Sequence, residues 1–386
     1  MKASEFSCPF EHLRKEDGVY QIEDHGESVH MVLRLKDLRK AAHSWEIFNS
    51  GSVDPGRIVI PSEVDVRDIR QIPVEMDPPQ HKDFRALLDP WFKRPLEEGF
   101  QQKLDVIIDE LLNEACSGEE IELVEEFSLK LQSRALTLLL NTAMDEADTW
   151  ISWGTHVFRG EGGELDSTKA GVVDEYILQK IEEASTSPGE DLFSVLLNSE
   201  VEGRKLSKEE VHGIMNLTFA GGRDTVINTL TNSIAYFAEH PEALQQIREN
   251  PDMVNNAVEE LVRYFSPLTQ LGRVAAEESM IGDCPIKKNE KIGLTWASAN
   301  RDESVFENPE EVILDRKRNP HVAFGFGIHA CLGATHARQI LRKVVKALSE
   351  RVDSIDIINF KENIESIGEI KRKVGFEEIN VRFNSK

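Results

Sequence analysis

A short segment, residues 324–333, sets the strongest constraint on what this chain can fold into. It reads Phe-Gly-Phe-Gly-Ile-His-Ala-Cys-Leu-Gly, so glycines at 325, 327 and 333 frame one cysteine, Cys331. Glycine adopts backbone conformations that other residues avoid, and the loop can therefore bend tightly. A helical pattern begins near Leu332, which puts the cysteine at a helix N-terminus, where free N–H groups and the helix dipole favour thiolate over thiol. Phe324 and Phe326 can shield the sulfur from water.

Cysteine usage alone leaves several roles open for this residue. The four cysteines, Cys8, Cys116, Cys284 and Cys331, lie far apart without a CxxC pair, which argues against a disulfide framework or a zinc site. A lone cysteine is often a buried structural residue, but it can also be a nucleophile or a metal ligand. Around Cys331, Phe at −7, Gly at −6 and −4, His at −2 and Gly at +2 form a long pattern that favours a functional role.

The charge balance excludes several classes of partner. The chain has 386 residues and a formal net charge of −24. Nucleic acids are excluded because phosphate binding needs a basic surface, and anionic membranes are disfavoured for the same reason. No stretch approaches the roughly 18 apolar residues of a membrane span, and the first residues contain no apolar signal segment. We therefore expect a cytoplasmic protein.

Apolar residues at three-to-four spacing predict a mainly α protein with a minor β region. Ser207 and Glu210 form a capping box that starts one of the helices. A mobile loop or short helices are expected over Gly160–Ser187, which is rich in Gly, Ser and Glu. Helices are predicted over Leu104–Ala115, Ile121–Leu140, Ser207–Glu239, Ala243–Phe265 and Ala334–Val352, and strands over Met31–Leu35, Lys291–Ala297 and Glu378–Phe383.

One predicted helix has an internal weak point. Gly221 and Gly222 lie in its middle, and each glycine costs about 1 kcal/mol relative to alanine. Such a cost indicates a kink or the close approach of another group. An acid and a hydroxyl, Asp224 and Thr225, follow at once, and such a pair can move protons. Without the cysteine segment, a packing glycine and a solvated Asp-Thr would be the better interpretation.

The cysteine segment resembles the signature of the cytochrome P-450 superfamily in its soluble bacterial form. The family pattern Phe-x-x-Gly-x-x-x-Cys-x-Gly is matched by Phe324, Gly327, Cys331 and Gly333. Other family segments follow in the expected order over essentially the whole chain. The resemblance implies one haem domain over residues 1–386, a triangular helical body that encloses haem b, and iron ligated by Cys331.

The resemblance also assigns roles on the opposite, distal side of the haem. Asp224 and Thr225 match the acid–alcohol pair, and Gly221 and Gly222 match the oxygen groove. Related peroxide-using enzymes replace this pair, so its presence favours dioxygen plus electrons. Arg223 is less usual, and the sequence does not say where it points.

Three charged residues are expected to have a structural role. Glu260 and Arg263 match the family's Glu-x-x-Arg, and Arg316 matches its third member. The spacing alone says little, because Glu11-x-x-Arg14 and Glu369-x-x-Arg372 have it too and most such pairs are exposed and weak.

Haem carboxylates need cationic partners, and four residues match the family's positions for them. His81 and Arg85 share one face of a helix that starts after Pro78-Pro79. Arg273 lies on a predicted strand, and His329 lies in the cysteine segment. Phe324, Gly325 and Gly333 are expected to contact the cofactor as well.

The chain contains no flavin or iron–sulfur segment, so the resemblance implies a ferredoxin and its reductase as electron donors. Cations that could attract an acidic ferredoxin flank the proximal face. They are Lys82, Arg85, Lys93, Arg94, His336, Arg338, Arg342 and Lys343.

The resemblance implies a small-molecule substrate, into which one oxygen atom from O2 is inserted at a C–H bond. Leu217, Ala220, Gly221, Thr269 and Gln270 match positions near the family's distal pocket. Thr269 and Gln270 add polar groups, which are compatible with the bacterial subgroup that removes methyl groups from sugars such as 6-O-methyl-galactose.

Two other classes of protein remain as alternatives. A non-catalytic haem-binding sensor needs Cys331 but not Asp224 or Thr225, so the intact pair speaks against it. A haem-free helical binding protein would show no visible absorbance after purification.

Overall fold

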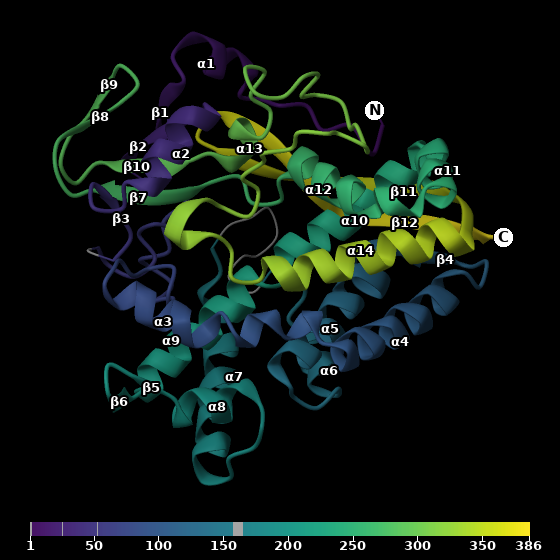
Figure 1. Ribbon diagram of the computed structural model, residues 1–386, viewed down its shortest axis with the longest axis horizontal. Helices are drawn as coiled ribbons and strands as arrows, with labels where there is room; N and C mark the ends of the chain where they lie inside the picture. Colours follow the sequence, from purple (N-terminus) through teal and green to yellow (C-terminus); the bar gives the residue numbers. More distant parts are fainter. Residues whose placement is uncertain (1, 25, 52, 157–164) are drawn as a thin grey trace.

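The computed structural model describes residues 2–24, 26–51, 53–156 and 165–386. Helices make up most of the body, and the strands gather in a smaller region at one side, so the predicted class, mainly α with a minor β region, is confirmed. The outline is roughly triangular (Figure 1). That residues 1–386 form a single haem domain stays a prediction.

The α-helices lie throughout the chain. In order they are α1 (Glu11–Glu16), α2 (Leu35–His43), α3 (Gln80–Leu88), α4 (Glu98–Ala115), α5 (Lys130–Leu140), α6 (Glu146–Ser152), α7 (Ser167–Thr186), α8 (Leu192–Asn198), α9 (Lys208–Gly221), α10 (Asp224–Glu239), α11 (Pro241–Glu249), α12 (Val254–Phe265), α13 (Trp296–Ala299) and α14 (Ala334–Arg351). Short helical turns of other types are η1 (Trp91–Leu96), η2 (Leu123–Leu129), η4 (Pro251–Met253) and η5 (Gly327–His329).

The largest sheet has the strand order β1-β2-β10-β7-β3, in which β2 and β10 pair in parallel and the other neighbours are antiparallel. Its strands are β1 (Val19–Asp24), β2 (Glu27–Val32), β3 (Phe48–Asn49), β7 (Leu271–Ala275) and β10 (Lys291–Leu294). A second sheet joins β11 (Val352–Ile367), β12 (Ile370–Ser385) and β4 (Glu120–Glu122). Two small hairpins are β5 (Glu200–Val201) with β6 (Arg204–Lys205), and β8 (Ser279–Ile281) with β9 (Cys284–Ile286).

Two predicted helices are broken where the sequence carries glycine or proline. Ser207–Glu239 divides into α9 and α10 at Gly222 and Arg223, and its capping box at Ser207 is confirmed. Ala243–Phe265 divides into α11 and α12 at Asn250-Pro251, because proline has no N–H to continue the helical bonds.

The prediction of one helix over Ile121–Leu140 is wrong for a different reason. Ile121 lies in β4, opposite Val381 of β12, and only from Lys130 does an ordinary α-helix run. A π-helix, η2, fills the space between. Pairing with a strand 260 residues away in the sequence is a tertiary effect that local periodicity cannot reveal.

The predicted strands are present but shifted. Met31–Leu35 is wrong at its end, since β2 stops at Val32 and Leu35 begins α2, whose buried residues have helical spacing. The strand predicted over Lys291–Ala297 likewise stops at Leu294, before the short helix α13. Glu378–Phe383 is confirmed, as part of the longer β12.

The expectation of a loop or short helices over Gly160–Ser187 is wrong for most of that range. Residues 167–186 form α7, a regular helix whose N-cap, Asp166, accepts bonds from the backbone N–H groups of Thr168 and Lys169. Residues 160–164 lie outside the described residues.

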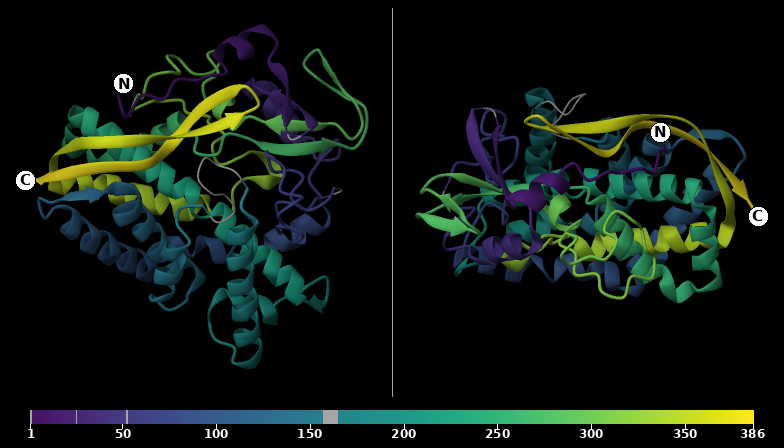
Figure 2. Two further views of the ribbon diagram at one scale, coloured as in Figure 1. Left: turned by 180° about the vertical axis from the view of Figure 1, so that it is seen from behind. Right: turned by 90° about the horizontal axis from the view of Figure 1, so that it is seen from above.

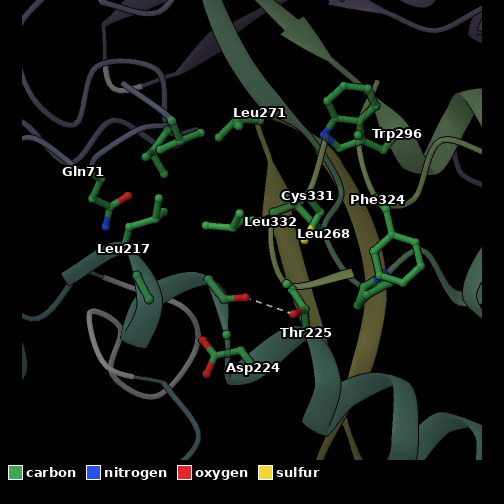
Figure 3. Close-up of a pocket in the computed structure, with 18 of the residues that line it drawn as sticks. Gln71, Leu217, Asp224, Thr225, Leu268, Leu271, Trp296, Phe324, Cys331 and Leu332 are labelled. Carbon is green, nitrogen blue, oxygen red and sulfur yellow. Dashed lines mark hydrogen bonds between the residues drawn. The ribbon is translucent and has the colours of Figure 1, made fainter. Parts of the chain in front are cut away.

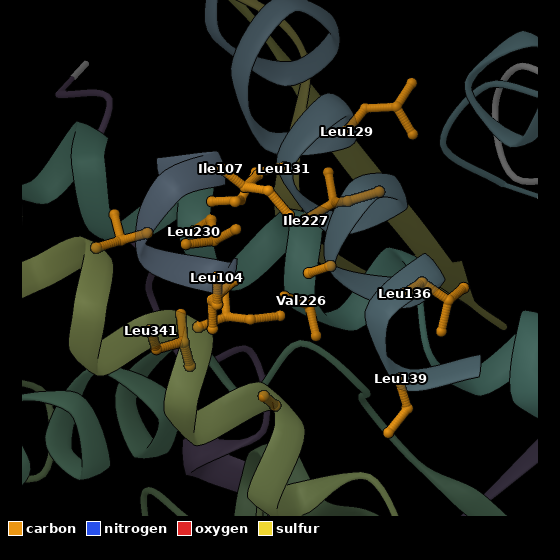
Figure 4. Close-up of a cluster of buried hydrophobic side chains, with 14 of the residues drawn as sticks. Leu104, Ile107, Leu129, Leu131, Leu136, Leu139, Val226, Ile227, Leu230 and Leu341 are labelled. Carbon is orange, nitrogen blue, oxygen red and sulfur yellow. The ribbon is translucent and has the colours of Figure 1, made fainter. Parts of the chain in front are cut away.

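The core positions α10 in the middle of the helical body. Val226, Ile227 and Leu230 of α10 pack among leucines of α4, α5 and α14 (Figure 4). These residues fix α10 in the core, and the start of the helix, at Asp224 and Thr225, lines a cavity. The long β11–β12 hairpin crosses the back of the molecule, and its turn reaches the same region (Figure 2).

Candidate active site

A cavity of about 1010 Å³ lies between the α9–α10 junction and the segment that carries Cys331. Figure 3 shows Asp224 and Thr225 on one side of this space and Cys331 with Leu332 on another. The predicted pocket residues Leu217, Ala220, Gly221, Thr269 and Gln270 all line it, as do the cysteine and the predicted cationic residues of the haem site.

The cysteine segment forms a tight loop before α14. Gly325 and Gly327 have φ angles of +74° and +75°, which favour glycine. A Cβ atom at Gly327 would lie 3.0 Å from the carbonyl oxygen of Ala42, so a side chain there would also be crowded. The N–H of Cys331 donates to the carbonyl of Phe324 at 2.7 Å and closes the loop. The Arg338 guanidinium lies 4.2 Å from the centre of the Phe324 ring.

Cys331 lies at the N-terminal end of α14, where its side chain is exposed to the cavity. The surrounding protein raises the pKa of the thiol, and the N–H groups of Gly333 and Ala334 act in the opposite direction. A positive charge placed against the sulfur, such as a metal ion, would reverse this balance.

The break between α9 and α10 exposes the acid and the alcohol to the cavity. The carbonyl of Gly222 is released from the helix and accepts a bond from the Gln132 side chain. Thr225 Oγ1 donates to the carbonyl of Gly221 at 3.2 Å. The predicted weak point is thus a true interruption rather than a kink.

Asp224 has a partner that the sequence did not reveal. Nδ1 of His156, from the loop after α6, lies 2.7 Å from its Oδ2. Both side chains are about one-quarter exposed, and both line the cavity. No motif marks His156, because the residue is 68 positions from Asp224 and follows an unrelated helix.

Arg223 points away from the cavity and fastens that loop. It is completely buried, and its Nη2 donates to the carbonyls of Trp150 and Gly154 at 2.7 and 2.6 Å. Burial lowers its pKa to about 10, even with Asp224 next to it. Arg223 therefore holds the α6 end that precedes His156 against the helix break.

Three cations predicted to face haem carboxylates do come together. The rings of His81 and His329 are 4.4 Å apart, and Arg273 lies beside them on β7. Burial lowers the pKa of His81 to about 4, that of His329 to about 3 and that of Arg273 to about 10. Asp77 is the nearest carboxylate, 4.0 Å from His329, but it accepts bonds from the backbone of Ser50 and Gly51.

These three basic residues lack a full set of hydrogen-bonding partners within the described part of the chain. His81 Nε2 is buried without a hydrogen bond there. Arg273 is 2% exposed, and its one hydrogen bond among those residues goes to the carbonyl of Gly272. Buried charge without a partner is unfavourable, so the geometry favours a missing anionic group.

Arg85 lies close to this group but is already engaged. It donates to Asp89 at 2.9 Å and to the carbonyl of Ala330 at 2.7 Å, next to Cys331. Its contact with the cysteine loop is clear, and its predicted contact with a haem carboxylate stays a prediction.

The predicted structural cluster forms as expected. Arg263 makes two bonds of 2.8 Å to the Glu260 carboxylate, and Arg316 makes one of 2.9 Å. Glu260 and Arg263 are fully buried, on the side of α12 away from the cavity. Their spacing and partners fit a role in folding.

Comparison with known proteins decides the family. Linalool 8-monooxygenase from Pseudomonas putida is 30% identical over 365 residues, which cover 90% of this chain and 89% of that protein. The chain belongs to the cytochrome P-450 family. The family model described as cytochrome P-450 matches residues 163–350. Steroid C26-monooxygenase from Mycolicibacterium smegmatis is 26% identical, over 92% of this chain and 86% of that one.

Solved structures agree with this assignment. One described as a carbohydrate active P-450 superposes with a TM-score of 0.97 and 56% identity over 100% of both chains. A P-450 from Bacillus megaterium, solved with testosterone, gives a TM-score of 0.79 and 27% identity over 97% of this chain and 98% of that one. The chain is thus a P-450 monooxygenase, and haem b bound through a cysteine thiolate is its cofactor.

The residues of this P-450 fit that cofactor. Cys331, His81 and Arg273 all line the cavity. His81 Nε2 has no hydrogen bond within the described residues and Arg273 donates there only to a backbone carbonyl, so two carboxylates would complete their bonding. The glycines of the loop leave room for a close planar group. When bound, haem supplies the activation of O2 that no side chain can supply.

The basic patch predicted for a ferredoxin is smaller than expected. His336 is 3% exposed, so its assignment to a surface patch is wrong. Arg338 and Arg342 share the Glu259 carboxylate, and Lys343 pairs with Asp105. Lys82 and Lys93 are exposed.

Within the described ranges, no helix of this P-450 has the length and apolar character to cross a bilayer.

Proposed function

We propose that Cys331 is the thiolate ligand of the iron and that Thr225 and Asp224 manage protons on the opposite side. The position of these residues around one cavity supports the proposal. The loop closed by the Cys331 N–H fixes the sulfur, and the interruption before α10 presents the hydroxyl.

The geometry gives each proton-handling atom a distinct task. Thr225 Oγ1 uses its hydrogen on the Gly221 carbonyl, which leaves its lone pairs to accept a bond from a cavity water. Asp224 Oδ2 is held by His156, whereas its Oδ1 is buried without a hydrogen bond in the described part of the chain. The Asp224–His156 pair lines the cavity and is therefore the group that can hold a proton there.

We propose oxidative removal of a methyl group from a sugar ether as the reaction. The observation that carries this proposal is the likeness, at 56% identity over the full chain, to a structure described as a carbohydrate active P-450. The polar residues Gln71, Thr269 and Gln270 at the cavity wall are compatible with a hydroxylated substrate.

The chemistry balances with the parts that the family provides. One oxygen atom of O2 is inserted into a C–H bond of the methyl ether, and the other leaves as water with two electrons and two protons. The resulting hemiacetal breaks its C–O bond to give the sugar alcohol and formaldehyde. We propose that the electrons arrive singly from a ferredoxin, with Lys82 and Lys93 as accessible cations on the proposed docking side.

Two measurements test the proposal. The reduced, carbon-monoxide-bound protein should show the red-shifted Soret band of thiolate-ligated haem, and Cys331→Ala should lose it. With a surrogate ferredoxin and reductase, 6-O-methyl-galactose should yield formaldehyde in proportion to electrons consumed. A histidine-like Soret band would contradict the ligand, and absence of formaldehyde despite substrate binding would contradict the reaction.

The proton assignment has its own test. Thr225→Ala should keep substrate binding but release more peroxide per electron, because water is no longer positioned. Thr231→Ala is a control in the same helix, where the hydroxyl bonds to the Ile227 carbonyl away from the cavity and should not affect coupling. Equal coupling in all three proteins would remove Thr225 from the mechanism.

A further inference from the structure

The turn of the β11–β12 hairpin brings a carboxylate into the cavity wall. Glu365, near the end of β11, is half-buried and lines the cavity beside Thr269 and Gln270. The predicted pocket residues did not include it, because it lies 96 positions beyond Thr269 along the chain.

Glu365 is held in a fixed orientation from behind. The Thr269 hydroxyl donates to its Oε2 and in turn accepts a 2.7 Å bond from Arg372 on β12. Arg372 also donates to the carbonyls of Phe265 and Ser266, at the end of α12. The hydroxyl hydrogen of Thr269 is used in its bond to Glu365. The group left to face a ligand is therefore the Glu365 carboxylate and not the threonine hydroxyl.

Gln270 provides an independent sign of a missing polar partner. It is 3% exposed, and neither Oε1 nor Nε2 has a hydrogen bond within the described residues. Gly293 lets the amide lie close, since a Cβ there would be 2.6 Å from Oε1. A buried amide usually has partners, and Gln270 would gain them from a ligand by turning from Gly293 towards the cavity that the residue lines.

The charge of the surrounding wall limits what that ligand can be. Glu63, Asp65 and Asp224 line the cavity as well as Glu365. Glu63 and the buried Glu75 share one cation, Arg67. Of the lining basic residues, Arg85, Arg273, His81 and His329 lie at the predicted haem-carboxylate side, and His156 pairs with Asp224. An anionic group placed beside Glu365 would therefore meet like charge at close range.

We propose that Glu365, positioned by Thr269 and Arg372 and accompanied by Gln270, accepts hydrogen bonds from the hydroxyl groups of an uncharged sugar and excludes sulfated or carboxylated sugars. This inference rests on the proposed sugar demethylation. It assigns Glu365 as the residue that determines specificity within that reaction.

The test is a spectral titration of the haem-loaded enzyme with 6-O-methyl-galactose, with a monosulfated 6-O-methyl-galactose and with imidazole, which binds the iron directly. The variants are Glu365→Gln and Glu365→Asp, and Glu369→Gln is the matched control, because Glu369 is exposed in the same turn. Glu365→Asp keeps the charge opposite Arg372 and serves if Glu365→Gln does not fold.

We expect the neutral sugar to bind the wild type at least tenfold more tightly than the sulfated one. Both Glu365 variants should weaken neutral-sugar binding, about 10- to 100-fold for Gln, the range of a hydrogen bond to a charged group. Glu365→Gln should also reduce the ratio of the two affinities, that for the neutral sugar over that for the sulfated sugar. Imidazole binding and the Glu369→Gln titration should not change.

The two ways of failing can be told apart. Unchanged neutral-sugar binding in both Glu365 variants, or equal binding of the sulfated sugar by the wild type, would overturn this inference and leave the proposed reaction standing. If no methylated sugar perturbs the wild-type spectrum while apolar ligands do, the proposed function and this inference both fall.

Discussion

Two buried charge clusters in this protein resolve the same physical problem in opposite ways. At Glu260, the chain supplies both signs: Arg263 donates to the carboxylate and to the carbonyls of Asn300, Pro309 and Glu311, and Arg316 donates as well. At the other cluster, the Arg273 guanidinium and the imidazoles of His81 and His329 are buried together with one carboxylate, Asp77, whose hydrogen bonds come mainly from the backbone of Ser50 and Gly51. We call these the closed cluster and the open cluster.

Their pKa values show the difference. Burial alone would raise the pKa of Glu260, but Arg263 and Arg316 lower it overall, so the closed cluster stabilises its own charge. In the open cluster burial lowers the pKa values of all three basic groups, so both histidines are neutral near pH 7 and Arg273 alone is charged. A closed cluster thus contributes to the fold, whereas an open one is poised for a ligand of opposite charge.

The largest effect should come from breaking the closed cluster. Glu260→Gln leaves two buried guanidinium groups without their anion, which should reduce the free energy of unfolding by about 3–5 kcal/mol, with or without haem. Urea unfolding measures this. Glu350→Gln, which removes one partner of an exposed pair with Lys346, is the control and should change little. A loss as small as that of the control would show that Glu260 is not the centre of the cluster.

Arg273→Met should have effects of opposite sign in the two states of the protein. Removing an unpaired buried charge should stabilise the haem-free protein, yet haem should be released about 10- to 100-fold faster, because a charged hydrogen bond is lost. Haem transfer to excess apoglobin and urea unfolding of the haem-free protein check the two signs. Destabilisation of the haem-free protein would mean that the cluster is already satisfied by the chain.

A chemical change in the ligand sharpens the same comparison. Haem whose two carboxylates are methyl esters should bind the wild type more weakly than haem does, because the open cluster then lacks its anions. Arg273→Met should reduce this discrimination severalfold, whereas Glu260→Asp, in the closed cluster, should retain it. Equal discrimination in the wild type and Arg273→Met would place the carboxylates elsewhere.

The smallest effect concerns pH. Burial, then Arg85 and Arg273, lower the pKa of His81 to about 4 from 6.5, so the unfolded chain takes up a proton first as the pH falls. The free energy of unfolding should therefore decrease as the pH falls from 6.5 to about 4. The decrease due to His81 should be about 1 kcal/mol by pH 5.5 in the haem-free protein.

His81→Gln should remove this part of the acid sensitivity, and bound haem should reduce it, because carboxylates favour protonated His81. Urea unfolding at several pH values measures both. In the closed cluster, the pKa of Glu260 is lowered from 4.5, so the stability that its charge contributes should be lost only at pH values below 4.5. Identical pH profiles for wild type and His81→Gln would refute the role of His81.

Three identical sequence patterns show how far the sequence could predict these clusters. Glu11, Glu260 and Glu369 each precede an arginine by three residues, and a helix-face argument treats them alike. In the fold only Glu260 pairs with its own arginine. Arg14 is buried against Glu303, and Arg372 against Thr269 and the end of α12. The family resemblance, and not the spacing, separated them.

The same limit applies to the active site. The cysteine loop and the acid–alcohol pair are each contiguous in sequence, so their motifs are sufficient to locate them. His156 and Glu365 reach the cavity from a loop and a hairpin turn whose placement depends on contacts between distant segments. The burial of His336 likewise follows from the packing of α14 against α4 near Phe100, which a helical pattern of charges does not reveal.

The closed cluster also bears on how the enzyme matures in the cell. All its groups come from one chain, so it can form in a unimolecular step whose rate is independent of haem supply. Filling the open cluster is bimolecular and should accelerate as haem accumulates. When haem is scarce, we expect newly made chains to accumulate as folded, haem-free protein. This protein can become active enzyme when haem binds, without new protein synthesis.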